Sequence, residues 1–412
     1  MTIKQKTIIT SIFLTLLPVF LLSQKNSHHP FSRYGVGEIV YEGFAQNRAL
    51  GGISAGLRFN NRINYQNPAS YTSQDTNSFV FDVGLQTAQN QFSTKNSEMI
   101  KNETNLNYMA IGFPVTSKWK SSIGVLPYSN TGYEISVSSE TGQKTQHYGY
   151  DGNGGLRKFY IGNAYEFNDN LSIGFNYFYL FGTIKNTSNI QWNDPEAYKF
   201  EDLLTKKKIK VNSHVFNIGA QYNTELFENY NLTLGASYDL SPGFKGEQTT
   251  MHTTNIDTVR PPAKSFNEKY PSNLLLGFSL SNQKITWGAD FKYTSWSNLS
   301  NFSNITDSYS FHTGIQYVPE REALKNYFKK INYRLGAYYK DGYYSFDGET
   351  IKDFGITFGL GLPLKYKKTN FNISCQLGKK GKVDNGLIEK RYAIINVGIT
   401  FFDFWFVQQK YQ

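Results

Sequence analysis

The sequence predicts an all-β protein: a transmembrane antiparallel β-barrel of about 14 strands whose lumen holds an N-terminal hatch or plug segment. Three observations support this prediction. Apolar and polar residues alternate with period two along most of the chain. The connections between these segments alternate between short and long. After the N-terminal region, no apolar stretch is long enough to form a spanning helix.

The chain begins with the pattern of a secretory signal. Lys4 and Lys6 precede an apolar stretch from Ile8 to Leu22, and cleavage is expected near Ser23. A membrane anchor is less favoured because threonines, a serine and Pro18 interrupt the stretch. We therefore divide the chain into a signal peptide at 1–23, a hatch at 24–78 and a transmembrane barrel at 79–412. An exported chain meets little nucleic acid, so the net charge of +10 does not indicate a nucleic-acid partner.

The barrel prediction depends on segments such as 285–294, where Ile285, Trp287 and Phe291 alternate with small or polar residues. Such a strand has one apolar face and one polar face. A secreted β-sandwich or propeller would also alternate, but it would carry charge on its polar faces. Here those faces contain Gly, Ser, Thr and Asn, and aromatic residues gather at strand ends, as in membrane-interface girdles. The predicted strands are 79–92, 105–116, 119–138, 156–167, 170–185, 209–224, 231–245, 270–282, 285–297, 308–318, 331–340, 353–364, 369–379 and 390–402.

The connections predict how this barrel is oriented. Connections after even-numbered strands are mostly short, whereas those after odd-numbered strands are long, which is the plan of an outer-membrane barrel with short periplasmic turns. An even strand number then places both termini on the periplasmic side of a bacterial outer membrane. The one long even connection, 319–330, is predicted to contain a short helix after Pro319. Outer loops are expected at 139–155, 186–208 and 246–269.

Residues 24–78 lack the strand pattern and are rich in Gly and Asn. Two runs stand out in this segment: Asn47-Arg48-Ala49-Leu50-Gly51-Gly52-Ile53-Ser54-Ala55-Gly56 and Ile63-Asn64-Tyr65-Gln66-Asn67-Pro68-Ala69-Ser70-Tyr71. Both resemble the N-terminal hatch of the FadL/TodX-type outer-membrane hydrophobic-compound transport family. The resemblance covers essentially the whole chain and implies a hatch built around Asn64, Asn67, Pro68 and Ala69. The alternative is that Asn67 and Pro68 only form an Asx-type turn leading into the first strand.

The third predicted strand contains Pro127, Asn130 and Gly132 in its middle. Proline cannot donate to a strand ladder, so the wall is expected to break or bend there. The family resemblance implies a kink in this strand that opens the wall sideways and releases an apolar ligand into the bilayer. The alternative is an ordinary β-bulge.

The resemblance implies a channel for hydrophobic small molecules, fatty-acid-like or aromatic, and not an enzyme. No Gly-x-Ser-x-Gly motif and no His-x-x-x-His spacing occurs, so we expect no catalytic residues, no metal site and no cofactor. One basic cluster, Lys206, Lys207, Lys208 and Lys210, is interpreted as a solvated loop, as a contact with anionic lipid headgroups, or as an attraction for a ligand carboxylate. Outer-membrane lipid and lipopolysaccharide are the expected surroundings.

The second functional hypothesis is a barrel of the same fold that does not transport. It would act as a subunit or docking partner of an outer-membrane protein secretion or assembly complex, with other outer-membrane proteins as partners. Two departures from a plain transporter favour it: an extra segment from Ser27 to Glu38 ahead of the hatch, and a tail at 404–412. A sealed lumen would support this hypothesis, whereas a continuous apolar tunnel would support transport.

Overall fold

The computed structural model describes residues 29–141, 144–193, 202–323, 325–364, 369–384 and 387–404. The predicted signal peptide at 1–23 and the tail at 405–412 lie outside the described residues. The side of the membrane on which the termini lie and the boundaries of the three segments therefore stay predictions.

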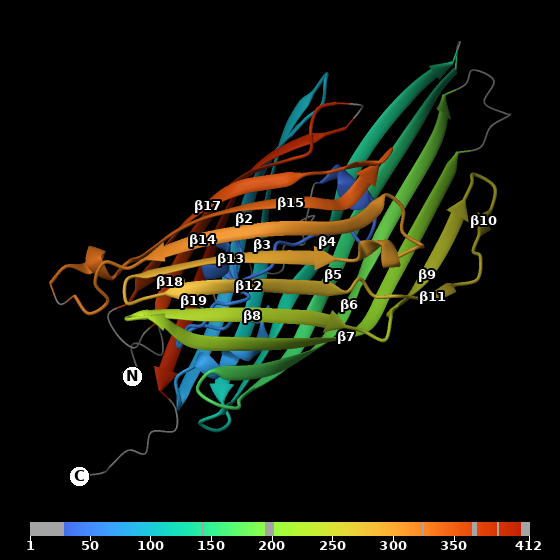
Figure 1. Cartoon of the computed structure of the whole chain (residues 1–412). Coiled ribbons are helices and arrows are strands. Elements are labelled where there is room, and N and C mark those ends of the chain that lie inside the picture. The colour runs from blue at the N-terminus through green and yellow to red at the C-terminus, as the bar shows by residue number, and fades with distance from the viewer. Residues whose placement is uncertain are drawn as a thin grey trace, which may run out of the picture.

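Fourteen strands of the described chain form one closed antiparallel barrel, which confirms the predicted fold class (Figure 1). The last strand pairs with the first along sixteen residue pairs, from Glu389↔Ser93 to Phe404↔Ser78, so the sheet has no free lateral edge at this seam. The barrel strands are β2 (Ser78–Ser93), β3 (Glu98–Pro114), β4 (Trp119–Thr141), β5 (Lys144–Glu166), β6 (Leu171–Asn193), β7 (Leu203–Phe227), β8 (Tyr230–Leu240), β12 (Asn273–Ser281), β13 (Ile285–Thr294), β14 (Ile305–Tyr317), β15 (Asn332–Phe346), β17 (Asp353–Pro363), β18 (Asn370–Lys380) and β19 (Glu389–Phe404).

Each predicted strand corresponds to one of these fourteen, but several strands are longer than predicted. β5 begins at Lys144 instead of 156, and β7 begins at Leu203 instead of 209. Much of the predicted outer loops at 139–155 and 186–208 is therefore strand. The loop predicted at 246–269 is also largely strand: β9 (Phe244–Thr253) pairs with β10 (Thr258–Val259) and β11 (Lys264–Glu268). These extensions lack the apolar alternation of the lipid-facing segments, because they project beyond the apolar belt.

The barrel wall is tall on one side and short on the other. β4, β5 and β6 have 23 residues each and β7 has 25, whereas β12 has 9 and β13 has 10. About 9–11 residues suffice to cross a membrane as a tilted strand. The tall strands, green in Figure 1, therefore project well past the short-walled side at the end away from the short turns.

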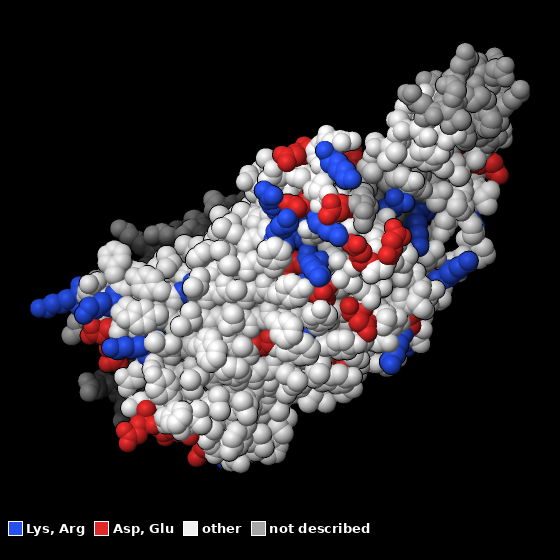
Figure 2. Space-filling view, turned by 45° about the horizontal axis from the view of Figure 1, so that its top comes forward, with Lys and Arg blue, Asp and Glu red and all other residues white. Residues whose placement is uncertain are grey.

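The outward face of the barrel carries the apolar belt that the alternation predicts. Large exposed apolar residues occur on every side of the wall, for example Ile173 on β6, Ile218 on β7, Trp287 on β13 and Phe358 on β17. Figure 2 shows, on the face in view, a nearly uncharged band between two charged ends. Such a band between charged rims is the surface of a transmembrane barrel. In the described part of the chain, no helix is both long and apolar enough to cross a bilayer.

The helix predicted in the connection 319–330 is wrong for most of its length. Among the described residues of this connection, the one helical element is a 3₁₀ turn, η5 (Tyr327–Lys330), capped by the Asn326 side chain. The backbone N–H of Glu320 instead donates to the Lys329 carbonyl across the connection, at 2.9 Å. This bond closes the connection on itself, so a continuous helix after Pro319 does not form.

Residues 29–77 enter the barrel and fill much of its lumen, where Figure 1 shows their blue ribbon inside the wall. Their short elements are η2 (Pro30–Arg33), β1 (Glu38–Ile39), α2 (Ala45–Arg48) and η3 (Pro68–Ser73). A further 3₁₀ turn, η4 (Trp296–Asn298), follows β13, and β16 (Glu349–Thr350) pairs with the end of β15. Below, we call residues 29–40 the strap and residues 43–77 the hatch.

Candidate functional site

The predicted hatch residues lie together at the inner wall of the barrel. Asn67 is fully buried and caps η3, with its Oδ1 accepting from the Ala69 N–H at 3.2 Å. Its side-chain amide donates to the Ala55 carbonyl at 2.8 Å and to the Ala220 carbonyl of β7 at 3.2 Å. The amide of Asn64 donates to the Ser54 carbonyl at 2.7 Å. The Asx-type turn therefore forms, and it also fixes the hatch to the wall; a gating role for these residues stays a prediction.

Wall glycines let the hatch backbone approach the strands directly. A Cβ atom on Gly235 of β8 would lie 1.9 Å from the Ala55 oxygen, and one on Gly314 of β14 would lie 2.2 Å from the Leu50 oxygen. A Cβ atom on Gly174 of β6 would lie 2.3 Å from the carbonyl carbon of Pro68. No side chain fits at such separations. The small residues that the sequence places on the inner faces of the strands are therefore the seat of the hatch.

Buried polar side chains hold the hatch in this seat. The carboxylate of Asp290 on β13 accepts from the backbone N–H groups of Ser54 at 2.6 Å and Ala55 at 2.9 Å. Arg48, only 3% exposed, donates to the Gly43 carbonyl at 3.0 Å and to Asn396 Oδ1 of β19 at 2.9 Å. Since a buried donor or acceptor without a partner costs about 1–3 kcal/mol, these contacts oppose movement of the hatch.

Strand β4 is continuous and carries a β-bulge at Pro127, and the pairing between β3 and β4 ends close to this bulge. In the described residues, the β3–β4 ladder covers only Met109–Pro114 against Lys120–Val125. Beyond this ladder, β4 keeps its pairing with β5 but shifts register between Pro127 and Ser129. The outer halves of β3 and β4 are therefore not paired with each other. Release of a ligand at this break between β3 and β4 stays a prediction.

The strap occupies the edge of β4 that β3 leaves. Strand β1 pairs with β4 in the register Glu38↔Asn130 and Ile39↔Ser129. Ser32 Oγ accepts from the Gly132 N–H at 3.1 Å, and Ser129 Oγ donates to the Val36 carbonyl at 2.6 Å. Asn130 and Gly132, which the sequence analysis assigns to a lateral opening, thus contact the strap. The extra segment Ser27–Glu38 is also recognisable in the sequence, but its position beside β4 is not.

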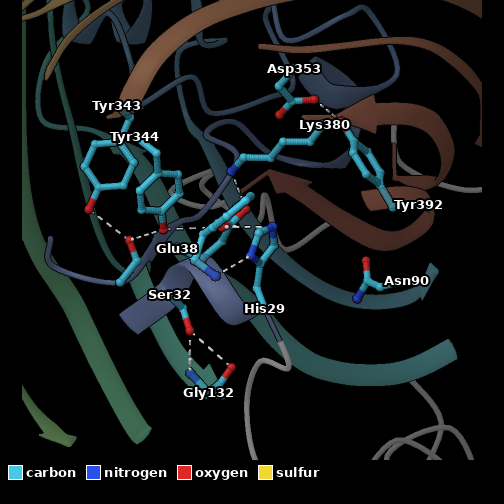
Figure 3. Close-up of polar contacts among 12 residues, drawn as sticks. His29, Ser32, Glu38, Asn90, Gly132, Tyr343, Tyr344, Asp353, Lys380 and Tyr392 are labelled. Atoms are coloured by element: carbon cyan, nitrogen blue, oxygen red, sulfur yellow. Dashed lines mark hydrogen bonds and ion pairs between the residues drawn. The ribbon is translucent and has the colours of Figure 1, made fainter. Parts of the chain in front are cut away.

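The opposite side of the strap is held by β15 and β18 (Figure 3). The hydroxyl groups of Tyr343 and Tyr344 donate to the Gly37 carbonyl at 2.9 and 3.0 Å. Lys380 Nζ lies 2.9 Å from Glu38 Oε1, and both side chains are largely buried. These three wall residues are not predictable from the sequence, because nothing in their local sequence sets them apart.

Charge and burial fix the protonation states within the strap. Burial is the largest cause that lowers the pKa of His29, well below its usual range, so the ring is neutral at pH 7. Burial would raise the pKa of the Glu38 carboxyl, but the charges of His29, when protonated, and of Lys380 hold it well below its usual range. The strap therefore carries a carboxylate paired with Lys380 and a neutral imidazole whose Nδ1 accepts from the Phe31 N–H at 3.2 Å.

Above the hatch, the lumen keeps a cavity of about 150 Å³. Both the N-terminal segment and the wall line it with charged side chains, including Glu38, Glu42, Lys158, Asp239, Lys292 and Lys340. Lys292 forms an ion pair with Glu42, and Lys158 lies over the Tyr128 ring with its Nζ 4.6 Å from the ring centroid. Ligand pockets are usually about 300–1,000 Å³ and mostly apolar. This cavity is smaller, and its charged side chains share the lining with aromatic and aliphatic ones. An apolar molecule in it would lie directly beside ion-paired groups.

The predicted basic cluster does not line this cavity and lies on strand β7, not in a loop. Lys206, Lys208 and Lys210 are exposed on the outward face, whereas Lys207 is half-buried and shares the inward side with Ile209. The interpretation as a solvated loop is therefore wrong. An attraction of these lysines for a ligand carboxylate at the outer end of the barrel stays a prediction.

The fold and the lumen define a class of protein: a fourteen-stranded barrel of the FadL type with an N-terminal plug. Solved structures support this fold. The Pseudomonas aeruginosa FadL homologue has a TM-score of 0.59 at 11% identity, covering 89% of this chain and 99% of that one. The Ralstonia pickettii toluene transporter TbuX gives 0.58 at 13%, covering 87% and 98%. The P. putida toluene transporter TodX gives 0.55 at 13%, covering 89% and 100%.

The family itself is a different one. The family model described as BamG matches residues 3–412, so this chain belongs to the BamG family. No curated protein matches the chain. The resemblance to FadL and TodX that the sequence suggests thus holds for the fold, while the family carries its own name.

Proposed function

We propose that this protein is a non-transporting barrel of the bacterial outer membrane that serves as a docking subunit of an outer-membrane protein complex. The observation that carries the proposal is the strap. It occupies the β4 edge at the one wall break found in the described residues, by strand pairing with Ser129 and Asn130. A lateral exit for an apolar ligand would need that position to be empty.

The lumen supports the same conclusion. The hatch is seated by backbone contact with wall glycines, and Arg48 and Asp290 hold it with buried hydrogen bonds. The remaining cavity is lined by the Lys292–Glu42 ion pair and by phenol groups, beside aliphatic side chains. Moving an apolar molecule along this path would strip water or partners from charged side chains, which is costly.

The docking surface that the structure offers is the outer half of β3. In the described chain, residues 98–104 have β2 as their only strand partner, so their edge that faces β4 is open to another strand. Three apolar side chains on this half are exposed, namely Met99 (42%), Ile100 (60%) and Leu106 (43%). An exposed apolar edge strand is a template for pairing with an extended segment of another protein.

The test is to purify the full chain gently from its native membrane through a C-terminal tag and to identify the accompanying proteins and lipids by mass spectrometry. We expect a stoichiometric outer-membrane protein partner. The Ile100→Asp variant should lower recovery of the partner about tenfold, as expected for a residue near the centre of an interface. Ile256→Asp is the matched control, because Ile256 is also exposed (81%) but lies at the tip of the β9–β10 hairpin. A lone barrel carrying an apolar ligand would contradict the proposal.

The second candidate function is a channel for hydrophobic small molecules, with lateral release at Pro127, Asn130 and Gly132. The observation that favours it is the break between β3 and β4, together with a fold shared with structures titled as toluene transporters. Uptake of radiolabelled toluene and of a long-chain fatty acid by cells with and without the protein tests it. A difference that disappears in a Pro127→Val variant would support the channel, and equal uptake would exclude it for these compounds.

A further inference from the structure

The outward face of the tall wall carries a group of lysines that the docking function does not use. It consists of Lys185 on β6, Lys206, Lys208 and Lys210 on β7, and Lys245 on β9. We propose that this basic patch binds the phosphate groups of a phosphorylated glycolipid, the lipopolysaccharide of the outer leaflet. The inference goes beyond the proposed function and does not depend on any protein partner.

The first argument is the order of side chains along β7. Its outward face runs from Ile218 through Phe216 and His214 to Asn212, and then to the three lysines. Tyr177 of β6 stacks on the His214 ring, with the two ring centroids 5.9 Å apart. Apolar, then aromatic, then cationic side chains follow the change from hydrocarbon through interface to headgroup. The lysines thus begin where lipid phosphates lie.

The second argument is electrostatic. Lys208 is directly opposite Lys185 in the β6–β7 ladder, so both ammonium groups leave the same face of the sheet. Lys206 and Lys210 lie on that face two residues away on either side, at about 7 Å along the strand. Like charges directly opposite each other destabilise a sheet unless an anion lies between them. In the described residues, none of these four lysines has an ion-pair partner.

The acidic groups near the patch do not neutralise it. Glu247 on β9 is opposite Lys210, and Lys245 is exposed on the same face of β9. Asp151 on β5 is separated from Lys206 by Thr187 on β6. Five lysines against one directly facing carboxylate leave an excess of positive charge, which suits an anionic headgroup with more than one phosphate.

The position of the patch selects the outer leaflet. The tall hairpins project at the end opposite the short turns. Outer-membrane barrels keep their short turns in the periplasm and their long extensions outside. The lipid next to the patch is therefore the phosphorylated glycolipid of the outer leaflet and not the phospholipid of the inner one.

The experiment uses the full chain, purified in detergent and stripped of bound lipid, with binding followed by native mass spectrometry. The probes are purified lipid A with its phosphates, the same lipid A after phosphatase treatment, and phosphatidylglycerol. Replacing Lys206, Lys208 and Lys210 with Gln together should weaken binding of phosphorylated lipid A on the order of a hundredfold, since each lysine near a lipid surface contributes about fivefold. Dephosphorylated lipid A should bind the wild-type chain as weakly as phosphorylated lipid A binds the triple variant.

Two further variants separate binding from folding and from overall charge. The control is a second triple variant, which replaces Lys118, Lys284 and Lys325 with Gln. It makes the same charge change at the short-turn end and should leave binding unchanged. Lys208→Glu converts the repulsive pair with Lys185 into an attractive one, so the folded barrel should be at least as heat-resistant while binding falls. Three outcomes would each overturn the proposal. The first is equal binding by the wild type and the lysine triple variant, and the second is an equal fall in binding in the control variant. The third is equal binding of phosphatidylglycerol and phosphorylated lipid A by the wild type.

Discussion

The strap and the hatch both fill the lumen, but different contacts hold them in place. The hatch backbone lies directly against wall glycines such as Gly235 and Gly314, and buried polar groups fix it there. The strap does not lie on wall glycines. Phe31 and Val36 bury it in the hydrophobic core, and side chains of β15 and β18 and two residue pairs with β4 hold it. Both segments are therefore buried, but close backbone packing fixes the hatch, whereas side-chain contacts and a short strand pairing hold the strap.

The largest effect on folding is expected from adding a side chain to a wall glycine that the hatch backbone contacts. In Gly235→Ala, the new Cβ would lie 1.9 Å from the Ala55 oxygen, so backbone atoms must move. Overpacking of this kind costs about 3 kcal/mol or more, and the yield of folded, heat-modifiable barrel should fall strongly. Gly149→Ala is the control, because its Cβ would make only ordinary contacts, with Asn189 Cβ at 3.8 Å and the Asn189 carbonyl oxygen at 3.9 Å. A normal yield of Gly235→Ala would show that the hatch is not rigidly seated.

Deletion of residues 29–40 should open the wall while the hatch stays in place. The β4 edge at Ser129 and Asn130 then loses its partner. We expect a folded barrel with ionic conductance in planar bilayers that the intact chain lacks, because buried polar groups at the break become hydrated. Loss of the folded barrel would instead show that the strap is as structural as the hatch, and an unchanged, non-conducting barrel would show that the hatch alone seals it.

A smaller effect is expected from removing the cation that pairs with the strap. Lys380→Met leaves the Glu38 carboxylate buried without its partner, which costs about 3 kcal/mol. Amide hydrogen exchange at residues 36–40 should become on the order of a hundred times faster. Lys382→Met is the matched control on the same hairpin, because its pair with Glu349 is exposed and contributes little. Equal rates of amide hydrogen exchange at residues 36–40 in both variants would contradict a role of the Lys380–Glu38 ion pair in holding the strap.

The smallest effect is a pH dependence of the strap. Burial keeps His29 neutral in the closed strap by lowering its pKa, whereas the released ring takes up a proton near its ordinary pKa of about 6.5. The open form therefore binds more protons, and closure weakens as the pH falls. Between pH 7.5 and 5.5 the loss should be about 1.4 kcal/mol, or about tenfold faster amide exchange in the strap. Glu38 stays ionised in this range, because its pKa is below its usual range.

His29→Asn tests the cause of this dependence. An asparagine side chain can accept from the Phe31 N–H as the imidazole does, so the N-cap is kept and only the titration is removed. The variant should show the same exchange rate in the strap at both pH values once intrinsic exchange is corrected. A pH dependence that persists in His29→Asn would assign it to another group.

Sequence periodicity is sufficient to predict which segments form strands, but it is not sufficient to predict where those strands end. All fourteen barrel strands were predicted, because a lipid-facing strand needs an apolar side chain at every second position. The outer parts of β5 and β7 were missed because water reaches that end of the barrel and the alternation stops there. Lys206 was placed in a loop for the same reason, although it lies within a strand.

The sequence by itself determined the barrel, its small-residue inner faces and the Asn67-Pro68 turn, because each depends on local periodicity or on a short motif. It also marked Pro127 and the segment Ser27–Glu38, but as unrelated features. Only the tertiary structure brought them together, because the pairing of β1 with β4 joins residues about ninety positions apart through backbone bonds that any side chain allows. The choice between an open wall and a sealed one was made by that long-range pairing.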